Sequence, residues 1–364
     1  MNDFSFRLYQ ALGADGNVNL VLSPYSVRAA LSRLFFGARG DTEAEMRTVL
    51  GFHNSRERTA MRLNEEDARL QAAFSGAEGC TLNLANKLWV QAGYKLLPEF
   101  LQLCRSGVES VDFKRNCEAA RLRINASIEQ DTKGMIKDLL GSGTLDSMVR
   151  LVITNAVYFF GFWAAKFKKE DTKAEPFYSL PGQGKTVDMM KQIGRFPFYE
   201  TDDVQILAMP YLGGKVQMIV VLPKAGFSLQ GVVWKIAHLY DWVAHFESRR
   251  VEVHFPKFTM EWGPTNLIPS LMAMGMKKVF RPNAADLSGI ELAGELYVSQ
   301  VVHKAKIVVN EEGTEAAAAT AIVTRSKGIV PVEKPIVFRA DHPFVYAIVD
   351  MDTNPIFIGN LITP

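Results

Sequence analysis

The sequence lacks the features that mark disulfide-rich, zinc-binding and membrane-spanning proteins. It has only three cysteines, an odd number with no CxxC spacing, which argues against both a disulfide framework and a zinc site. They are Cys80, Cys104 and Cys117. The longest apolar run, at 151–163, is interrupted by Thr154 and Asn155 and is too short to cross a bilayer. We therefore expect no bound metal and no membrane segment.

An excess of one charge is also missing. The chain has 41 basic and 39 acidic residues, a net charge of +2, so no strong field favours nucleic acid or an anionic membrane. One arginine-rich segment, at 56–69, interleaves its cations with glutamates and an aspartate, as a solvated helix face does. Weak binding of a polyanion to this segment remains an alternative.

Catalytic and nucleotide-binding motifs are absent as well. The sequence contains no GxSxG, HExxH, GxGxxG or GxxxxGK[ST] pattern, and its six histidines never stand at short ligand spacing. His303 lies in the middle of a strand pattern, which favours a hydrogen-bonded core histidine over a catalytic base. We therefore assign no catalytic residue, cofactor or metal ligand, and we do not expect an enzyme.

The order of the expected elements indicates one α+β domain over 1–364. Apolar residues recur at helical spacing near Phe4 and again after Ser23-Pro24, which predicts two helices. A third helix is indicated by Thr42 and Glu45, which have the spacing of a capping box, and by Gly51, which is the expected helix end. Further helix and strand patterns cover 119–130 and 83–91. From residue 148 onward strands dominate, including a run at 148–160 that is typical of a strand buried on both faces. Helices first and strands later, without regular alternation, argue against a doubly wound sheet.

Strand signals in the second half are specific enough to place turns. The runs 205–211 and 216–223 flank Leu212-Gly213-Gly214, which predicts a hairpin. Residues 251–255 alternate at period two, and 295–310 forms another long strand pattern. The tail offers two more strands around Asn354-Pro355.

The segment 310–335 departs from these local rules. Four alanines with high helix propensity follow a long strand and a glycine, then run into β-branched residues. If the segment is laid on a strand, every even position from Thr314 to Ser326 is uncharged, whereas the charges of Glu315, Arg325 and Lys327 all fall on the opposite face. Alanine loses no side-chain entropy on ordering, so such a loop can become a strand at little cost beyond its backbone freedom.

Several motifs along the whole chain resemble those of the serpin family. They are NVNLVLSPYSV at 17–27, TNAVYFFGFW at 154–163, VFRPNAADLSGI at 279–290, EEGTEAAAATA at 311–321, FRADHPFVYAI at 338–348 and PIFIGNL at 355–361. The resemblance implies a fold of three β-sheets and about eight or nine helices, with an exposed reactive loop at about 310–335. It also implies a mechanism in which a protease attacks the loop, forms an acyl-enzyme and is trapped when the cut loop inserts into the central sheet.

The composition of the hinge distinguishes inhibitory from non-inhibitory members of the family. Inhibitory members carry glycine, then threonine or serine, then small residues, because a charge or a proline stalls insertion. By resemblance the hinge comprises Glu311, Glu312, Gly313, Thr314, Glu315, Ala316, Ala317, Ala318, Ala319 and Thr320. These residues fit the inhibitory form. The alternative is a non-inhibitory chaperone, carrier or storage protein.

Residue-by-residue comparison with the family carries over a sheet-opening cluster. Its members are Ser23, Ser26, Asn155, Trp163 and His303. The polar positions under the middle of the central sheet are matched by Ser23, Ser26, Asn155 and His303. Trp163 matches the top of that sheet, where the loop first enters. Ile268-Pro269 stands in a region where some members place a basic partner for the hinge acid, so we expect that salt bridge to be missing.

The family's usual spacing from hinge to reactive bond, counted from Glu311, ends at Lys327, with Gly328 following. Arg325-Ser326 is the alternative bond. Either places a long cation before the cut, which suits a trypsin-like serine protease. If Ile329 or Val330 precedes the bond, the target is elastase-like or chymotrypsin-like. We expect a monomer whose partner is that protease.

The N-terminal segment, MNDFSFRLYQALG, lacks the basic flank and apolar run of a signal peptide. Together with the end at Thr363-Pro364, it resembles the intracellular, ovalbumin-like branch of the family. The expected location is the cytoplasm, or the cell exterior after unconventional secretion.

Overall fold

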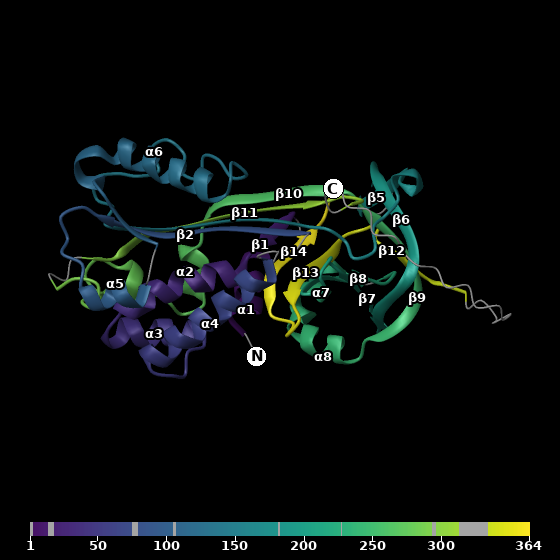
Figure 1. Ribbon diagram of the computed structural model, residues 1–364, viewed down its shortest axis with the longest axis horizontal. Coiled ribbons are helices and arrows are strands. Elements are labelled where there is room, and N and C mark those ends of the chain that lie inside the picture. The colour runs from purple at the N-terminus through teal and green to yellow at the C-terminus, as the bar shows by residue number, and fades with distance from the viewer. Residues whose placement is uncertain are drawn as a thin grey trace.

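The computed structural model describes residues 3–13, 18–74, 79–104, 107–180, 183–226, 228–292, 296–312 and 334–364. Within them the strands join into a five-stranded sheet and a nine-stranded sheet. The helices α1–α5 lie on one face of the five-stranded sheet and α6 lies on the other (Figure 1). None of the described helices is long and apolar enough to cross a membrane.

The five-stranded sheet has the order β10-β11-β4-β2-β3. The bounds of its strands are β2 Cys80–Gln91, β3 Val108–Val111, β4 Leu151–Gly161, β10 Phe258–Asn266 and β11 Val298–Val309. Strand β4 is buried along its whole length, as its continuous β-branched and aromatic run predicts. The two strands beside β4 run in opposite directions, because β2 pairs with it antiparallel and β11 pairs with it parallel.

The nine-stranded sheet has the order β1-β14-β13-β8-β7-β6-β9-β12, with β5 also paired to β6. Its bounds are β1 Leu20–Leu22, β5 Lys173–Leu180, β6 Gln183–Glu200, β7 Val204–Pro210, β8 Val216–Pro223, β9 Glu247–Pro256, β12 Ile336–Arg339, β13 Phe344–Asp350 and β14 Pro355–Leu361. The predicted hairpin is confirmed, because β7 and β8 pair antiparallel around Gly213 and Gly214, both with positive φ. The strands form two hydrogen-bonded sheets rather than three because β6 pairs with β9 and, at its end, also with β7.

The described residues contain nine α-helices. They are α1 Asp3–Gly13, α2 Pro24–Gly37, α3 Gly40–Leu50, α4 Arg56–Phe74, α5 Pro98–Cys104, α6 Phe113–Asp131, α7 Leu229–Lys235, α8 Leu239–Ala244 and α9 Ile268–Ala273. Helix α2 begins as predicted, with Ser23 as N-cap and Pro24 in the first turn. Gly51 ends α3 in the left-handed conformation, also as predicted.

The predicted capping box at Thr42 and Glu45 is wrong. The N-cap of helix α3 is Arg39, three residues before the predicted one, so Thr42 lies inside its first turn. Thr42 Oγ1 accepts from the backbone N–H of Asp286 at 2.9 Å, and Glu45 Oε2 accepts from the N–H of Lys277 at 2.7 Å. Both side chains therefore join α3 to a distant segment instead of closing its own first turn.

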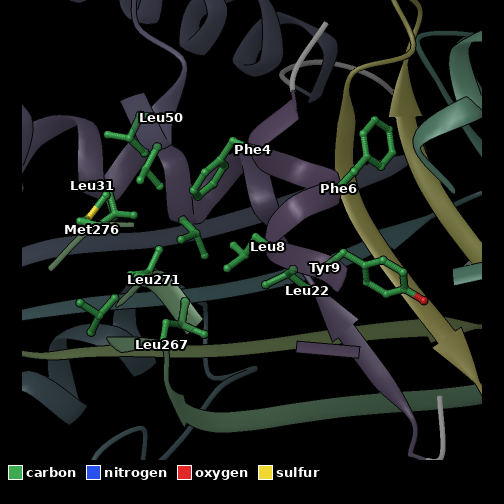
Figure 2. Packing of buried hydrophobic residues seen from close by; sticks show 14 of the residues in the cluster. Phe4, Phe6, Leu8, Tyr9, Leu22, Leu31, Leu50, Leu267, Leu271 and Met276 are labelled. Carbon is green, nitrogen blue, oxygen red and sulfur yellow. The ribbon is translucent and has the colours of Figure 1, made fainter. Parts of the chain in front are cut away.

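The core beneath the five-stranded sheet is built from residues far apart in sequence. Figure 2 shows Phe4 and Leu8 of α1 close to Leu31 of α2 and Leu271 of α9. On the opposite face α6 packs its Ile124 and Ile128 over Trp89, Val152 and Ala156. The strands β4 and β11 are thus covered on both sides. Any strand that enters between them requires movement of these covering layers.

Candidate functional site

The site is the line along which β4 and β11 pair, together with the polar groups beneath it and the hinge above it. The two strands hydrogen-bond directly to one another in parallel register, from Val298 beside Leu151 to Ile307 beside Phe159. Strand β11 leads into Asn310, Glu311 and Glu312, where the hinge begins. A chain that turns back from this point runs antiparallel to β11, and therefore also antiparallel to β4.

Four of the predicted polar residues lie together under the middle of this line. Asn155 of β4 and His303 of β11 are register partners, and His303 Nδ1 hydrogen-bonds Asn155 Oδ1. Asn155 Nδ2 donates to Ser26 Oγ at 2.7 Å. The backbone N–H of Ser23 donates to His303 Nε2 at 3.5 Å. These residues connect the two strands to the start of α2.

The bonds of His303 fit the neutral imidazole. Nε2 faces a backbone N–H and must accept, so the ring proton is on Nδ1, which donates to Asn155. A protonated ring would bring two N–H groups together at Ser23. Complete burial also lowers the pKa of His303, to about 3, because it disfavours the charged form. The cluster is therefore uncharged at neutral pH.

The sequence did not identify Asn86 as a member of this cluster. Asn86 of β2 accepts through Oδ1 from Ser26 Oγ at 2.8 Å and from Asn155 Nδ2 at 2.5 Å. It is paired with Asn155 across the two antiparallel strands, so knowledge of the strand register would have found it. Through Asn86 the cluster spans three strands of the sheet.

Trp163 lies apart from these four residues, at the hinge. Its indole Nε1 donates to the carbonyl oxygen of Asn310 at 2.9 Å, and its ring stacks on Tyr211 with centroids 4.5 Å apart. The carbonyl oxygen of Glu311 accepts from the N–H of Phe167 at 3.0 Å. The segment after β4 thus holds the last residues of β11 in place.

The hinge acids both have cationic partners, so the expectation of a missing salt bridge was wrong. Glu311 Oε2 lies 3.4 Å from Lys257 Nζ, and Glu312 Oε1 lies 2.5 Å from Lys169 Nζ. Ile268 belongs to helix α9, not to a strand, and so does not stand opposite the hinge. Burial alone would raise the pKa of Glu311, but its own backbone N–H and Lys257 outweigh this effect and lower it.

The remaining predicted positions lie outside the described residues. These are Gly313, Thr314, Glu315, Ala316, Ala317, Ala318, Ala319 and Thr320 of the hinge, and Arg325, Ser326, Lys327 and Gly328 at the two candidate bonds. The described chain resumes just before β12, which pairs with β9 in the nine-stranded sheet. Among the described residues no group of three His, Cys, Asp or Glu side chains is placed to hold a metal ion.

The family model "Serpin (serine protease inhibitor)" matches residues 1–364. The chain belongs to the serpin family. It is 37% identical to an uncharacterized serpin-like protein of Thermococcus kodakarensis, over 100% of this chain and 85% of that protein. It is also 37% identical to leukocyte elastase inhibitor of Bos taurus, over 95% and 93%.

Solved serpin structures share the whole fold. Uncleaved ovalbumin is similar with a TM-score of 0.87 and 31% identity, covering 100% of this chain and 98% of that one. A tumour-suppressing serpin gives a TM-score of 0.88 at 26% identity, again over 100% and 98%. The serpin α+β fold expected from the motifs is therefore confirmed.

Proposed function

We propose that this serpin inhibits trypsin-like serine proteases as a suicide substrate. The observation that carries the proposal is the direct parallel pairing of β4 with β11, next to a hinge whose composition is that of inhibitory members. Insertion of the cut loop replaces one parallel ladder by two antiparallel ones, which are slightly more stable per residue. Each new hydrogen bond contributes about 0.5–1.5 kcal/mol, so a strand of several residues makes insertion strongly favourable.

The covalent step follows the chemistry of serine proteases. The protease serine Oγ attacks the carbonyl carbon of Lys327, the amide bond to Gly328 breaks, and the Gly328 nitrogen leaves as an amine with the proton delivered by the protease histidine. Lys327 is then held to the protease as an ester. As residues 313–327 enter between β4 and β11, the ester-linked protease is carried along and its catalytic site is distorted. The serpin itself acts as a trap and not as a catalyst.

Trypsin-like specificity rests on Lys327 or Arg325, each of which presents a cation to a carboxylate in the protease pocket. The leukocyte elastase inhibitors among the relatives support the alternative, an elastase-like target cutting after Ile329 or Val330. Both alternatives use the same loop and the same insertion step.

The proposal is tested by incubating the protein separately with trypsin, elastase and chymotrypsin, followed by denaturing electrophoresis and mass spectrometry. We expect a band of higher mass with trypsin, together with a released C-terminal fragment that begins at Gly328. A fragment that begins at Ser326 selects the alternative bond. Trypsin whose serine has been blocked serves as the control and should give no such band. Cleavage by all three proteases without a stable complex would contradict the proposal and favour a non-inhibitory serpin.

A further inference from the structure

Strand β12, which follows the reactive loop, is held in the nine-stranded sheet by few contacts. It is an edge strand of four residues, Ile336–Arg339, and among the described strands it pairs only with β9, in parallel (Figure 1). Parallel pairing is slightly less stable per residue than antiparallel pairing. Of its side chains only that of Phe338 is buried. The contacts just beyond its C-terminal end are therefore important for its attachment.

The carboxylate of Asp341, two residues after β12, lies at the centre of these contacts. Arg339 Nε donates to Asp341 Oδ2 at 2.8 Å, and His342 Nδ1 lies 3.0 Å from Asp341 Oδ1. The carbonyl oxygen of Asp341 accepts from the N–H of Tyr178 in β5 at 2.7 Å. Arg339 also pairs with Glu175 of β5. The end of β12 is thus tied to β5.

His342 connects the same carboxylate to β8. Its Nε2 lies 2.8 Å from the carbonyl oxygen of Pro223, the last residue of β8. A carboxylate and a carbonyl oxygen can only accept, so both ring nitrogens must donate, as they do only in the protonated imidazole. Burial alone would lower the pKa of His342, but the bonds to Asp341 and Pro223 outweigh this effect and raise it.

The other charged and titratable groups on the elements around His342 form pairs among themselves. Arg339 pairs with Glu175, His254 with Glu252, Lys224 with Glu200 and Lys235 with Asp203. Lys224 directly follows Pro223, and its carboxylate partner lies 3.0 Å from its Nζ. None of these groups replaces Asp341 as the carboxylate partner of His342.

We propose that His342 is a proton-dependent clamp on β12, the strand that ends the reactive loop. The protonated ring joins Asp341 to Pro223 and thereby holds the end of β12 against β8. When the ring loses one proton to water, the nitrogen that lost it faces an acceptor with no proton between them, and that bond breaks. Strand β12 then separates from β9 more often. The proposal concerns the anchoring of the loop and holds whether or not the protein traps a protease.

The contribution of the clamp to stability has a definite pH dependence. The pKa of His342 is higher in the folded protein than its value of about 6.5 in the unfolded chain, so the contribution is complete below that pH. It is lost as the pH rises through the pKa of the folded state. The direction is opposite to that of the neutral, buried His303, whose pKa is lowered and which destabilises the fold in acid.

The test is hydrogen–deuterium exchange of the intact chain at pH 6.0 and pH 8.5, read by mass spectrometry on peptides that cover 336–341. Each variant is compared with the wild type at the same pH, so the pH dependence of the exchange chemistry cancels. At pH 6.0 we expect His342→Ala to exchange these amides at least about threefold faster, because the bonds to Asp341 and Pro223 are both lost. The factor is modest because the His342 side chain is 36% exposed. At pH 8.5 the difference should shrink to less than about twofold.

His342→Arg is the conservative variant. Arginine keeps a cation and several N–H groups but does not titrate in this range, so it should protect β12 equally at both pH values. His53→Ala is the matched control, since His53 is exposed in the segment between α3 and α4, and it should leave the exchange of 336–341 unchanged. Slow exchange of the buried strand β4 in the same samples verifies that each variant is folded.

The proposal is overturned if folded His342→Ala protein and the wild type exchange 336–341 at the same rate at pH 6.0. It is also overturned if the difference between them is as large at pH 8.5 as at pH 6.0, because the histidine would then act without its second proton.

Discussion

The indole Nε1 of Trp163 donates a 2.9 Å hydrogen bond to the carbonyl oxygen of Asn310, one residue before the hinge acid Glu311. This bond ties the segment that follows β4 to the end of β11. If the cut loop inserts as proposed, it enters at this end, and the bond opposes the first step of insertion. In the proposed mechanism, contacts such as this one hold the sheet closed until the loop is cut.

Replacing Trp163 by Phe should lower the stability of the intact protein. The change keeps a ring for stacking on Tyr211 but leaves the partly buried Asn310 carbonyl without its donor, which costs about 1 kcal/mol. Urea unfolding followed by tryptophan fluorescence and circular dichroism measures the change. Trp234→Phe is the control, since Trp234 is 56% exposed and should be neutral. Equal midpoints for both variants would contradict the role assigned to Trp163.

The two ion pairs at the hinge should differ in how much they contribute to the stability of the folded protein. The side chain of Glu311 is only 8% exposed, so Lys257→Met leaves a largely buried carboxylate without its cation. This substitution should lower the free energy of unfolding by about 1–2 kcal/mol, a loss limited by the partial exposure of Lys257. Lys169→Met at the neighbouring pair should change stability by less than about 0.5 kcal/mol, because Lys169 is 70% exposed. Chemical denaturation of the two variants side by side measures the difference. The reverse order of effects would show that Lys257 does not support the hinge.

Burial of neutral His303 predicts that stability falls in acid. Its pKa in the folded protein, about 3, is below its value of about 6.5 in the unfolded chain, so between these pH values only the unfolded chain takes up the proton. Above pH 6.5 the residue contributes no pH dependence. Below it, stability should fall by about 1.4 kcal/mol per pH unit from this residue alone.

The check is the free energy of unfolding measured from pH 7.5 to pH 5 for the wild type and for His303→Gln. The variant can keep a donor toward Asn155 but does not titrate, so its pH profile should be flatter than that of the wild type, even if its stability at pH 7.5 is lower. Parallel profiles would show that another group causes the acid sensitivity.

The alternation of charge along the hinge predicts opposite outcomes for neighbouring substitutions. In the sequence pattern Thr314 belongs to the uncharged face, which enters the core in the proposed mechanism. Thr314→Arg should therefore give a protein that is cleaved without forming a stable complex. Glu315 belongs to the charged face, so Glu315→Arg should keep most of the trapping. The ratio of complex to cleaved product on denaturing gels measures both. Equal loss in the two variants would contradict the assignment of faces.

The sequence predicted the strands well because their signals are local. The buried run that became β4 and the glycine turn between β7 and β8 each carry their information within a few residues. Family motifs placed Asn155 and His303 in one cluster, although the residues are 148 positions apart.

Partners that come from distant segments could not be predicted in this way. Lys257 and Asn86 have ordinary local surroundings, and only the register of β10 with β11 and of β2 with β4 brings them to the site. The capping box at Thr42 failed for the opposite reason, because the local pattern was present but the helix already began at Gly40.

The central claim, insertion of the cut loop between β4 and β11, is tested most directly by comparing the unfolding temperature of the intact protein with that of the protein cleaved in its loop. Insertion adds two antiparallel ladders to the sheet, so we predict a rise of at least about 10 °C after cleavage, on the order of what about 10 kcal/mol of new hydrogen bonding produces in a chain of this size. An unfolding temperature that is unchanged or lower after cleavage would show that the loop stays outside the sheet, and the account of this protein as an inhibitor would be wrong.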